Sequence, residues 1–272
     1  MHPRQFLTSR QKNEIEYHRK HAELHKDILK KPFSYEVVTS KKRRWENAYW
    51  EMYTFLLDQQ VKGKNILIAG CGFGEDVLRL AKMGAKVYAF DLSPESLEIA
   101  EKLASRENAL NIDFREMPIE SMDYEANFFD YILARDIFHH VQIKEAMEEI
   151  VRVSKNEAVF VLNEVYSHSI LDKIRHCIFI EKKIYPLLQS FIYEGDIYIT
   201  KDESKLNQFD INFITRFLEK ILIKKYFNFF VGRFIPDRYN ILNKLDRVLL
   251  LSMGPVAQLT SGRILIAGTI RK

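Results

Sequence analysis

The chain has 272 residues, 47% of them apolar, which is enough to bury one substantial hydrophobic core. Lys and Arg number 41 against 37 Asp and Glu, and the resulting net charge of +4 is far from the composition of a nucleic-acid-binding protein. The two cysteines, Cys71 and Cys177, are too few for a disulfide-rich scaffold or a cysteine-rich zinc site.

The sequence indicates neither a secretory signal nor a membrane span. Residues 1–20 are polar and charged. The most apolar late stretch, from Phe227 to Ile235, is too short to cross a bilayer and contains Arg233. We therefore expect a cytoplasmic protein without a transmembrane segment.

Residues 1–60 are predicted to form an N-terminal helical cap. Apolar and aromatic side chains recur at helical offsets between Tyr49 and Leu57, and a more polar helical segment precedes them. Pro32 and Ser34 separate the two segments.

Short apolar runs alternate with amphipathic segments between residues 61 and 165. Ser93 followed by Pro94 is typical of a helix start, with Ser as the N-cap and Pro at the first helical position. The predicted strands are residues 66–69, 86–90, 111–114, 131–134 and 158–162. Strands that alternate with helices predict an α/β fold with a parallel sheet covered on both faces.

The alternation stops after Glu164. We then predict a mostly helical stretch, a strand, a helix and a final strand, at residues 166–222, 226–231, 241–252 and 263–267. We expect residues 166–260 to be helical insertions that form a substrate lid. Residues 261–272 would supply the last strand of an antiparallel pair that closes the sheet.

Aromatic side chains are frequent in the predicted lid, and an acceptor with an apolar part would fit them. For most of them the alternatives are core packing or a dimer face, which leaves a homodimer open. These residues are Tyr185, Phe191, Tyr193, Tyr198, Phe209, Phe213 and Phe217.

A glycine-rich loop follows the first predicted strand, at Gly70-Cys71-Gly72-Phe73-Gly74. Glycines let the backbone turn tightly and approach a ligand closely, at the sheet edge where ligands bind in such folds. Asp91 ends the next strand, 21 residues after Gly70, and a carboxylate there can accept hydrogen bonds from ribose hydroxyls. The pattern therefore implies an adenosine-containing ligand.

The spacing within the loop favours S-adenosylmethionine. A dinucleotide-binding loop needs Gly or Ala where this chain has Glu75, and the Gly-Lys-Ser/Thr of a phosphate-binding loop is absent. No Tyr-x-x-x-Lys pair supports the alternative, an NAD-dependent oxidoreductase.

Three motifs carry a resemblance to a known family: Ile66 to Asp76, Ala89 to Pro94, and Phe128 to Ala134 followed by Phe138-His139-His140-Val141. With them the chain resembles class I S-adenosylmethionine-dependent methyltransferases, in particular the small-molecule and quinone methyltransferase branch. The resemblance implies a Rossmann-like, seven-stranded, mostly parallel sheet with helices on both faces, an N-terminal helical cap and C-terminal helical insertions.

The resemblance also implies cofactor contacts. Gly70, Cys71, Gly72 and Gly74 would line the methionine end, Asp91 would hold the ribose, and Leu92 would pack on the adenine. Pro118 and Ile119 fall where relatives grip the adenine edge, usually with an Asp that this chain lacks at that place. Arg135 could reach the cofactor carboxylate or the acceptor, and the helix with Tyr17 resembles one that closes over the cofactor.

Catalytic candidates follow from the chemistry of methyl transfer. A hydroxyl acceptor benefits from a general base, whereas a carboxylate acceptor needs none. His139 and His140 come just after the fourth strand, with Asp136 and His18 as further candidates. The alternative for either histidine of the pair is that it only packs or caps the following helix. No metal ligands are predicted.

We therefore expect methyl transfer to an oxygen, hydroxyl or carboxylate, of a small molecule or short peptide. The alternatives are transfer to nitrogen or carbon, an NAD-dependent oxidoreductase, and a non-catalytic cofactor-binding subunit. A nucleic-acid acceptor is not expected, because the Asn/Asp-Pro-Pro-aromatic motif of amine-methylating enzymes is replaced by Ala134-Arg135-Asp136-Ile137.

Overall fold

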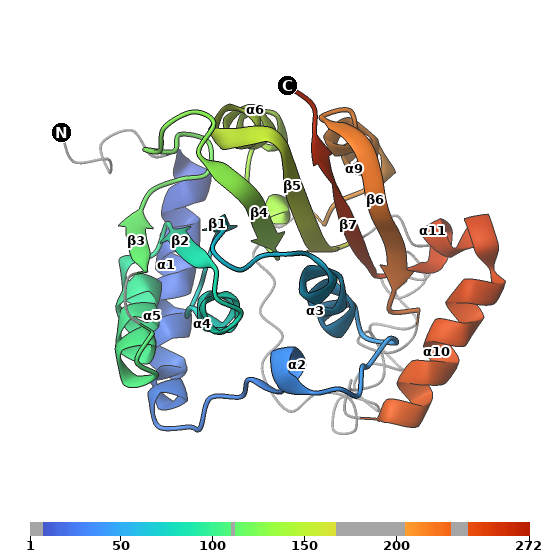
Figure 1. The fold of residues 1–272 in the computed structure, drawn as a ribbon, viewed down its shortest axis with the longest axis horizontal. Coiled ribbons are helices and arrows are strands. Elements are labelled where there is room, and N and C mark those ends of the chain that lie inside the picture. Colours follow the sequence, from blue (N-terminus) through green and yellow to red (C-terminus); the bar gives the residue numbers. More distant parts are fainter. Residues whose placement is uncertain (1–7, 110–111, 167–204, 230–238) are drawn as a thin grey trace.

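A computed structural model describes residues 8–109, 112–166, 205–229 and 239–272 (Figure 1). Within these residues one seven-stranded sheet runs in the order β3-β2-β1-β4-β5-β7-β6. Strands β1 to β5 pair in parallel with one another, and β7 is antiparallel to both β5 and β6. The predicted α/β fold and its antiparallel closure are confirmed.

The strands are β1 (Asn65–Ala69), β2 (Lys86–Asp91), β3 (Asp113–Glu116), β4 (Phe129–Arg135), β5 (Ser154–Val165), β6 (Leu218–Phe227) and β7 (Arg263–Ile270). The described α-helices are α1 (Ser9–Leu24), α2 (Glu36–Thr39), α3 (Ala48–Asp58), α4 (Glu75–Lys82), α5 (Pro94–Arg106), α6 (Ile143–Val153), α9 (Gln208–Thr215), α10 (Asn240–Ser252) and α11 (Ala257–Thr260). Short 3-10 helices cover Lys26–Leu29, Phe138–His140 and Gly254–Val256.

Alternation along the strands divides the core between the two faces of the sheet. In β1, Ile66 and Ile68 belong to the cluster that contains α3 and α4 side chains, whereas Leu67 and Ala69 belong to the cluster with α6 and α9. Successive side chains of a strand point to opposite faces, so an all-apolar run is buried on both. Figure 1 shows these helices on either side of the sheet.

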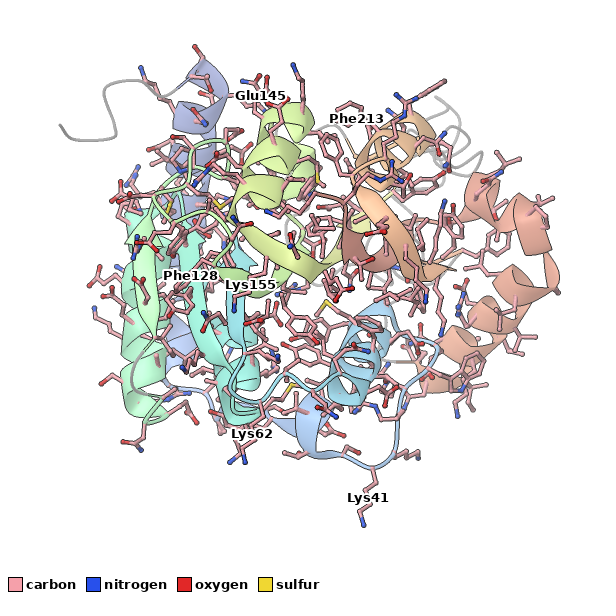
Figure 2. All side chains as sticks on the ribbon, turned by 45° about the horizontal axis from the view of Figure 1, so that its top comes forward. Lys41, Lys62, Phe128, Glu145, Lys155 and Phe213 are labelled. Carbon is pink, nitrogen blue, oxygen red and sulfur yellow. The ribbon has the colours of Figure 1, made fainter. Side chains whose placement is uncertain are left out.

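Many charged side chains lie on the surface of the molecule. Lys41 and Lys62, both exposed, project from the surface in Figure 2. In the described part of the chain no helix is long and apolar enough to cross a membrane.

The region after β5 differs from its prediction. Strand β6 begins at Leu218, so the strand predicted around residues 226–231 was placed too late, and the stretch 166–260 is not helical throughout. The cause is that β6 is an edge strand, in which Lys220 and Lys224 are exposed and interrupt the apolar pattern.

Only some residues of the predicted aromatic lid lie within the described part of the chain. Tyr185, Phe191, Tyr193 and Tyr198, like Cys177, lie outside the described residues. Of the others, Phe209 is 78% exposed. Phe217 packs against the core, and its ring centroid lies 5.3 Å from that of Phe213.

The N-cap of α5 offers a test of the local sequence signals. Ser93 is fully buried, and its hydroxyl accepts a hydrogen bond from the Ser96 N–H at 3.2 Å. We predict that Ser93→Ala lowers the free energy of unfolding by about 1 kcal/mol, and that Ser93→Gly costs only a few tenths, because Gly is itself tolerated at an N-cap. Urea unfolding measures both. Equal losses in the two variants would contradict the capping role.

Candidate active site

A cavity of about 710 Å³ lies at the carboxyl ends of the parallel strands. Its walls include Gly70 to Phe73 after β1, Asp91 and Leu92 at the end of β2, Met117 to Glu120 after β3, and Arg135 to Ile137 after β4. The chain order reverses at β1, which lies between β2 and β4. Ligands of open α/β sheets bind at such a reversal, and the volume is that of a small-molecule site.

The glycine loop is built from left-handed backbone. Gly72 has φ 52°, and a Cβ built there would meet nothing within 4 Å. Gly74 has φ 81°, and its Cβ would lie 2.9 Å from Ala100 Cβ in α5. Gly72 therefore leaves room at the cavity wall. Gly74 instead permits the close approach of α4 to α5, and it is not among the residues that line the cavity.

Asp91 connects the two loops that follow β1 and β2. One carboxylate oxygen accepts the Gly72 N–H at 2.8 Å, and the other accepts the Ser93 N–H at 2.9 Å. The residue is 7% exposed and lines the cavity. Each carboxylate oxygen can accept a second hydrogen bond, so Asp91 retains the capacity to bind sugar hydroxyls.

Apolar side chains continue the wall beside Asp91. Leu92, Pro118 and Ile119 lie where the sequence places them, and Met117 joins them. An apolar slot next to a carboxylate fits a flat base attached to a ribose, so the residues present fit an adenosine group. Met117 was missed because a methionine after a short strand carries no sequence signal of its own.

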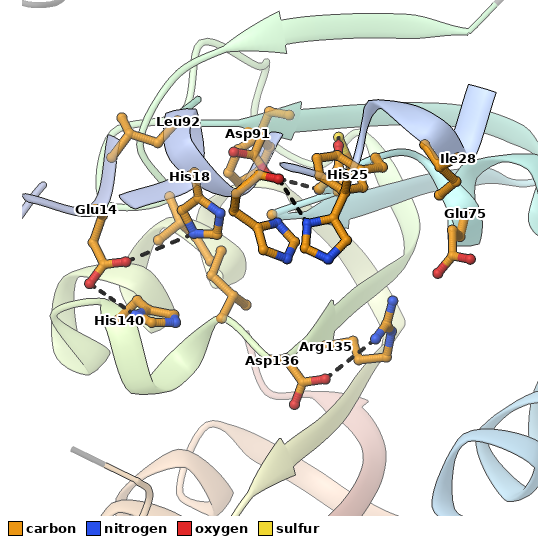
Figure 3. Close-up of a pocket in the computed structure, with 18 of the residues that line it drawn as sticks. Glu14, His18, His25, Ile28, Glu75, Asp91, Leu92, Arg135, Asp136 and His140 are labelled. Carbon is orange, nitrogen blue, oxygen red and sulfur yellow. Dashed lines mark hydrogen bonds and ion pairs between the residues drawn. The ribbon is translucent and has the colours of Figure 1, made fainter. Parts of the chain in front are cut away.

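Helix α1 crosses the cavity and contributes Glu14, His18 and His21 to its wall, and its C-cap residue His25 also lines the cavity. Glu14 Oε1 lies 3.0 Å from His140 Nδ1, and Glu14 Oε2 lies 3.8 Å from His18 Nε2 (Figure 3). The structure thus brings together His18 and His140, two of the predicted candidates. Tyr17, on the same helix, is not among the lining residues.

Sequence reasoning missed Glu14. It stands one helical turn before His18, and that spacing was an available signal. Burial raises the pKa of Glu14, but the contact with His140, the charge that His140 and His18 carry when protonated, and the charge of Arg10 outweigh it, so the pKa lies below its usual value. An ionised carboxylate therefore faces His140 at neutral pH.

His139 is not among the residues that line the cavity. It is buried, and its Nδ1 is 2.6 Å from Glu164 Oε1. The fully buried Glu164 also accepts the N–H groups of Ile137 and Phe138, at 2.9 and 2.8 Å. His139 therefore packs and holds the turn after β4, as the alternative interpretation expects, and neither it nor Glu164 lines the cavity.

Arg135 and Asp136 line the cavity but are bound to other side chains. Arg135 Nε donates to Asp76 Oδ2 at 2.7 Å, and Arg263 donates to Asp136 Oδ1 at 2.8 Å. The Arg135 guanidinium also lies 3.3 Å from Asp136 Oδ2. These contacts hold both side chains in place at the wall of the cavity.

Asp76 in α4 accepts hydrogen bonds from three side chains. Besides Arg135, the hydroxyls of Tyr49 and Tyr53 donate to its Oδ1, each at 2.7 Å. Burial raises the pKa of Asp76, but Arg135 and the two tyrosines more than compensate and hold it below its usual value. Among the described residues no group of three or more His, Cys, Asp or Glu side chains could hold a metal ion.

Comparison with known proteins finds relatives of the central part of the chain. Residues 67–162 match the family described as Methyltransferase domain. A ubiquinone biosynthesis O-methyltransferase of Methylocella silvestris is 41% identical over 81 residues, which cover 30% of this chain and 31% of that protein. A ubiquinone/menaquinone biosynthesis C-methyltransferase of Zymomonas mobilis is 28% identical over 131 residues, 47% of this chain and 54% of that protein.

The fold is also that of solved methyltransferases. Geranyl diphosphate C-methyltransferase from Streptomyces coelicolor, crystallised with Mg²⁺, geranyl diphosphate and S-adenosyl-L-homocysteine, has a TM-score of 0.58 at 12% identity, covering 97% of this chain and 99% of that chain. Residues 67–162 of the present chain thus match a methyltransferase domain, and the chain shares its fold with a solved methyltransferase. The two curated relatives match it over about a third and a half of their length.

The glycine loop yields a stability prediction. Gly72→Ala and Gly74→Ala each place a Cβ in left-handed backbone, at a cost of roughly 1–2 kcal/mol. Only Gly74→Ala also drives its Cβ into Ala100. We expect Gly74→Ala to lower the free energy of unfolding by about 1–3 kcal/mol more than Gly72→Ala does. Guanidinium unfolding compares the two, and equal losses would argue against the α4–α5 contact as the reason for Gly74.

Asp76 yields a prediction about pH. The pKa of Asp76 is lower in the folded chain than in the unfolded chain. Its contribution to the free energy of unfolding is therefore complete above the pKa of the unfolded chain, and it is lost as the pH falls through the pKa of the folded chain. We expect Asp76→Asn to lower the free energy of unfolding by about 3–5 kcal/mol at pH 7. In acid, the free energies of unfolding of the variant and the wild type should become more alike.

Asp130→Asn is the matched control. Asp130 pairs at 3.0 Å with the partly exposed Lys155, so its loss should cost about 1 kcal/mol or less for that pair. Urea unfolding at neutral and acid pH measures both variants. A cost for Asp76→Asn that stays constant into acid would contradict the ionised network.

Proposed function

We propose that this protein transfers the methyl group of S-adenosylmethionine to a hydroxyl oxygen of a small molecule, with His140 as the general base. The observation that carries the proposal is the Glu14–His140 pair in the wall of the cavity. The methyltransferase domain supports the reaction class.

The residues proposed to hold the cofactor are those around the glycine loop. Gly70, Cys71 and Gly72 would contact its methionine end, Asp91 its ribose, and the Leu92, Pro118 and Ile119 wall its adenine. When bound, the cofactor supplies a methyl group already activated on a sulfonium. The protein then has to position the acceptor in line and exclude water.

His140 is arranged to take a proton. Its Nδ1 faces the Glu14 carboxylate, which favours the tautomer with the proton on Nδ1 and leaves Nε2 as the basic nitrogen. The acceptor O–H proton would move to Nε2 as the oxygen–methyl bond forms and the sulfur–methyl bond breaks. Glu14 would stabilise the resulting imidazolium, and a positioned base of this kind contributes about 10²–10⁴ in rate.

The acceptor is proposed to be a hydroxyl-bearing aromatic of the quinone class. Two relatives are named for ubiquinone biosynthesis, although they match only part of this chain. Apolar residues such as Phe33, Ile137 and Val141 also line the cavity. A partly apolar acceptor with one ionisable hydroxyl would fit such a wall.

Transfer to carbon is the second candidate. The relative that aligns over 47% of this chain is named a C-methyltransferase. The same histidine could then remove the C–H proton after the new carbon–carbon bond forms. NMR spectra of the product distinguish the two outcomes, because the new methyl group is bonded to oxygen in one and to carbon in the other.

The proposal predicts a specific kinetic defect. With dihydroxybenzene acceptors and radiolabelled S-adenosylmethionine, His140→Gln should lower kcat about 100-fold or more. Its affinity for S-adenosylhomocysteine should stay near that of the wild type.

Glu14→Gln is the companion variant. It keeps the size of the side chain but removes the charge opposite His140, so we expect a smaller loss of kcat. Unchanged turnover in His140→Gln would remove His140 from the mechanism. Normal binding of S-adenosylhomocysteine with no turnover on any acceptor would instead favour a non-catalytic cofactor-binding subunit.

A further inference from the structure

Helix α10 presents an apolar face to the outside of the molecule. Figure 1 shows α10 at the outer edge, beyond β6. Its exposed aliphatic side chains have exposed fractions between 39% and 76%, and they are Ile241, Leu242, Leu245, Val248, Leu249 and Leu251. At 3.6 residues per turn these six positions fall within roughly half of the helix circumference. We call them the α10 apolar face.

The opposite, polar side of α10 attaches the helix to the protein. The Arg247 guanidinium donates to the Tyr226 carbonyl and lies 4.2 Å from the centre of the Phe227 ring. Asp246 Oδ2 accepts the Phe229 N–H at 2.9 Å. Both residues are buried. These specific contacts fix the rotation of the helix, so the outward direction of the apolar face is built into the fold.

Such a face is unusual for a water-exposed helix. Amphipathic surface helices normally bury their apolar stripe and expose their charges, whereas α10 does the reverse. Contiguous apolar patches on a protein surface mark sites of interaction with another molecule or a membrane. Val256, on the 3-10 helix that follows, is 52% exposed and extends the apolar surface.

The composition of the face favours a lipid surface over a protein partner. Protein interfaces are enriched in Tyr, Trp, Phe, Met and Arg, but the α10 apolar face contains only Ile, Leu and Val. Aliphatic side chains need no complementary pocket in the acyl region of a bilayer.

The charges around the face point the same way. Lys244 is the one charged residue on the outward half of α10. Positive charge beside an apolar helix face is the pattern that attracts anionic headgroups.

We propose that α10 lies in the interface of an anionic lipid bilayer and attaches this protein to the membrane surface. The helix has 13 residues, so it would lie along the surface with Leu245 and its neighbours inserted at the level of the headgroups. The attachment does not depend on the proposed methyl transfer, because it uses neither the cavity nor the cofactor.

The test is sedimentation of the full chain with lipid vesicles, without cofactor or acceptor. Vesicles of phosphatidylcholine containing a quarter phosphatidylglycerol should bind the wild type, and pure phosphatidylcholine should bind it more weakly. Leu245→Glu should lower the bound-to-unbound ratio about tenfold or more, because one side chain is withdrawn from the interface. Lys244→Gln should reduce the preference for the anionic vesicles.

Leu57→Glu is the matched control, since it makes the same change at a 40% exposed leucine on α3. It should bind vesicles like the wild type. Circular dichroism and the unfolding midpoint verify that each variant is folded. Vesicle binding by Leu245→Glu equal to that of the wild type would overturn the proposal. A second result would also overturn it: light scattering shows that the wild type is a dimer that binds no vesicles, and that Leu245→Glu dissociates this dimer. A second copy of the chain would then cover the face.

Discussion

The carboxylate of Asp91 is the contact on which the geometry of the cavity depends. It accepts one backbone N–H from the glycine loop and one from the start of α5, so the loops after β1 and β2 are held at a fixed separation. The left-handed backbone of the glycine loop allows Gly72 N–H to point at that carboxylate. Asp91 both organises two loops and lines the cavity, so it links the stability of the sheet edge to the shape of the cavity.

Two further carboxylates attach distant parts of the chain to this edge. Asp76 joins α3 to β4 through Tyr49, Tyr53 and Arg135. Glu14 joins α1 to the turn after β4 through His140. Each carboxylate is buried and stays ionised because cationic and hydroxyl groups surround it. The helices that precede the sheet therefore complete the site, and the methyltransferase domain match alone, at residues 67–162, does not contain all of its walls.

The features that sequence could predict are local. Apolar runs placed β1, β2 and β4, and Ser93-Pro94 marked the start of α5, because these signals depend on neighbouring residues. Edge strand β6 was placed too late in the sequence, because its exposed lysines interrupt the apolar pattern by which a strand is predicted. Sequence could not distinguish His139 from His140, because the turn of a 3-10 helix decides which ring faces Glu164 and which faces the cavity. Glu14 was missed because its partner is far away along the chain.

The central claim is that this cavity binds S-adenosylmethionine through Asp91. Titration calorimetry with S-adenosylhomocysteine and with NAD, on the wild type and on Asp91→Ala, tests it most directly. The account predicts binding of S-adenosylhomocysteine but not of NAD, with an affinity that falls roughly tenfold to a hundredfold in the variant as hydrogen bonds to a charged group are lost. Binding of NAD alone, or an unchanged affinity for S-adenosylhomocysteine in Asp91→Ala, would contradict the account.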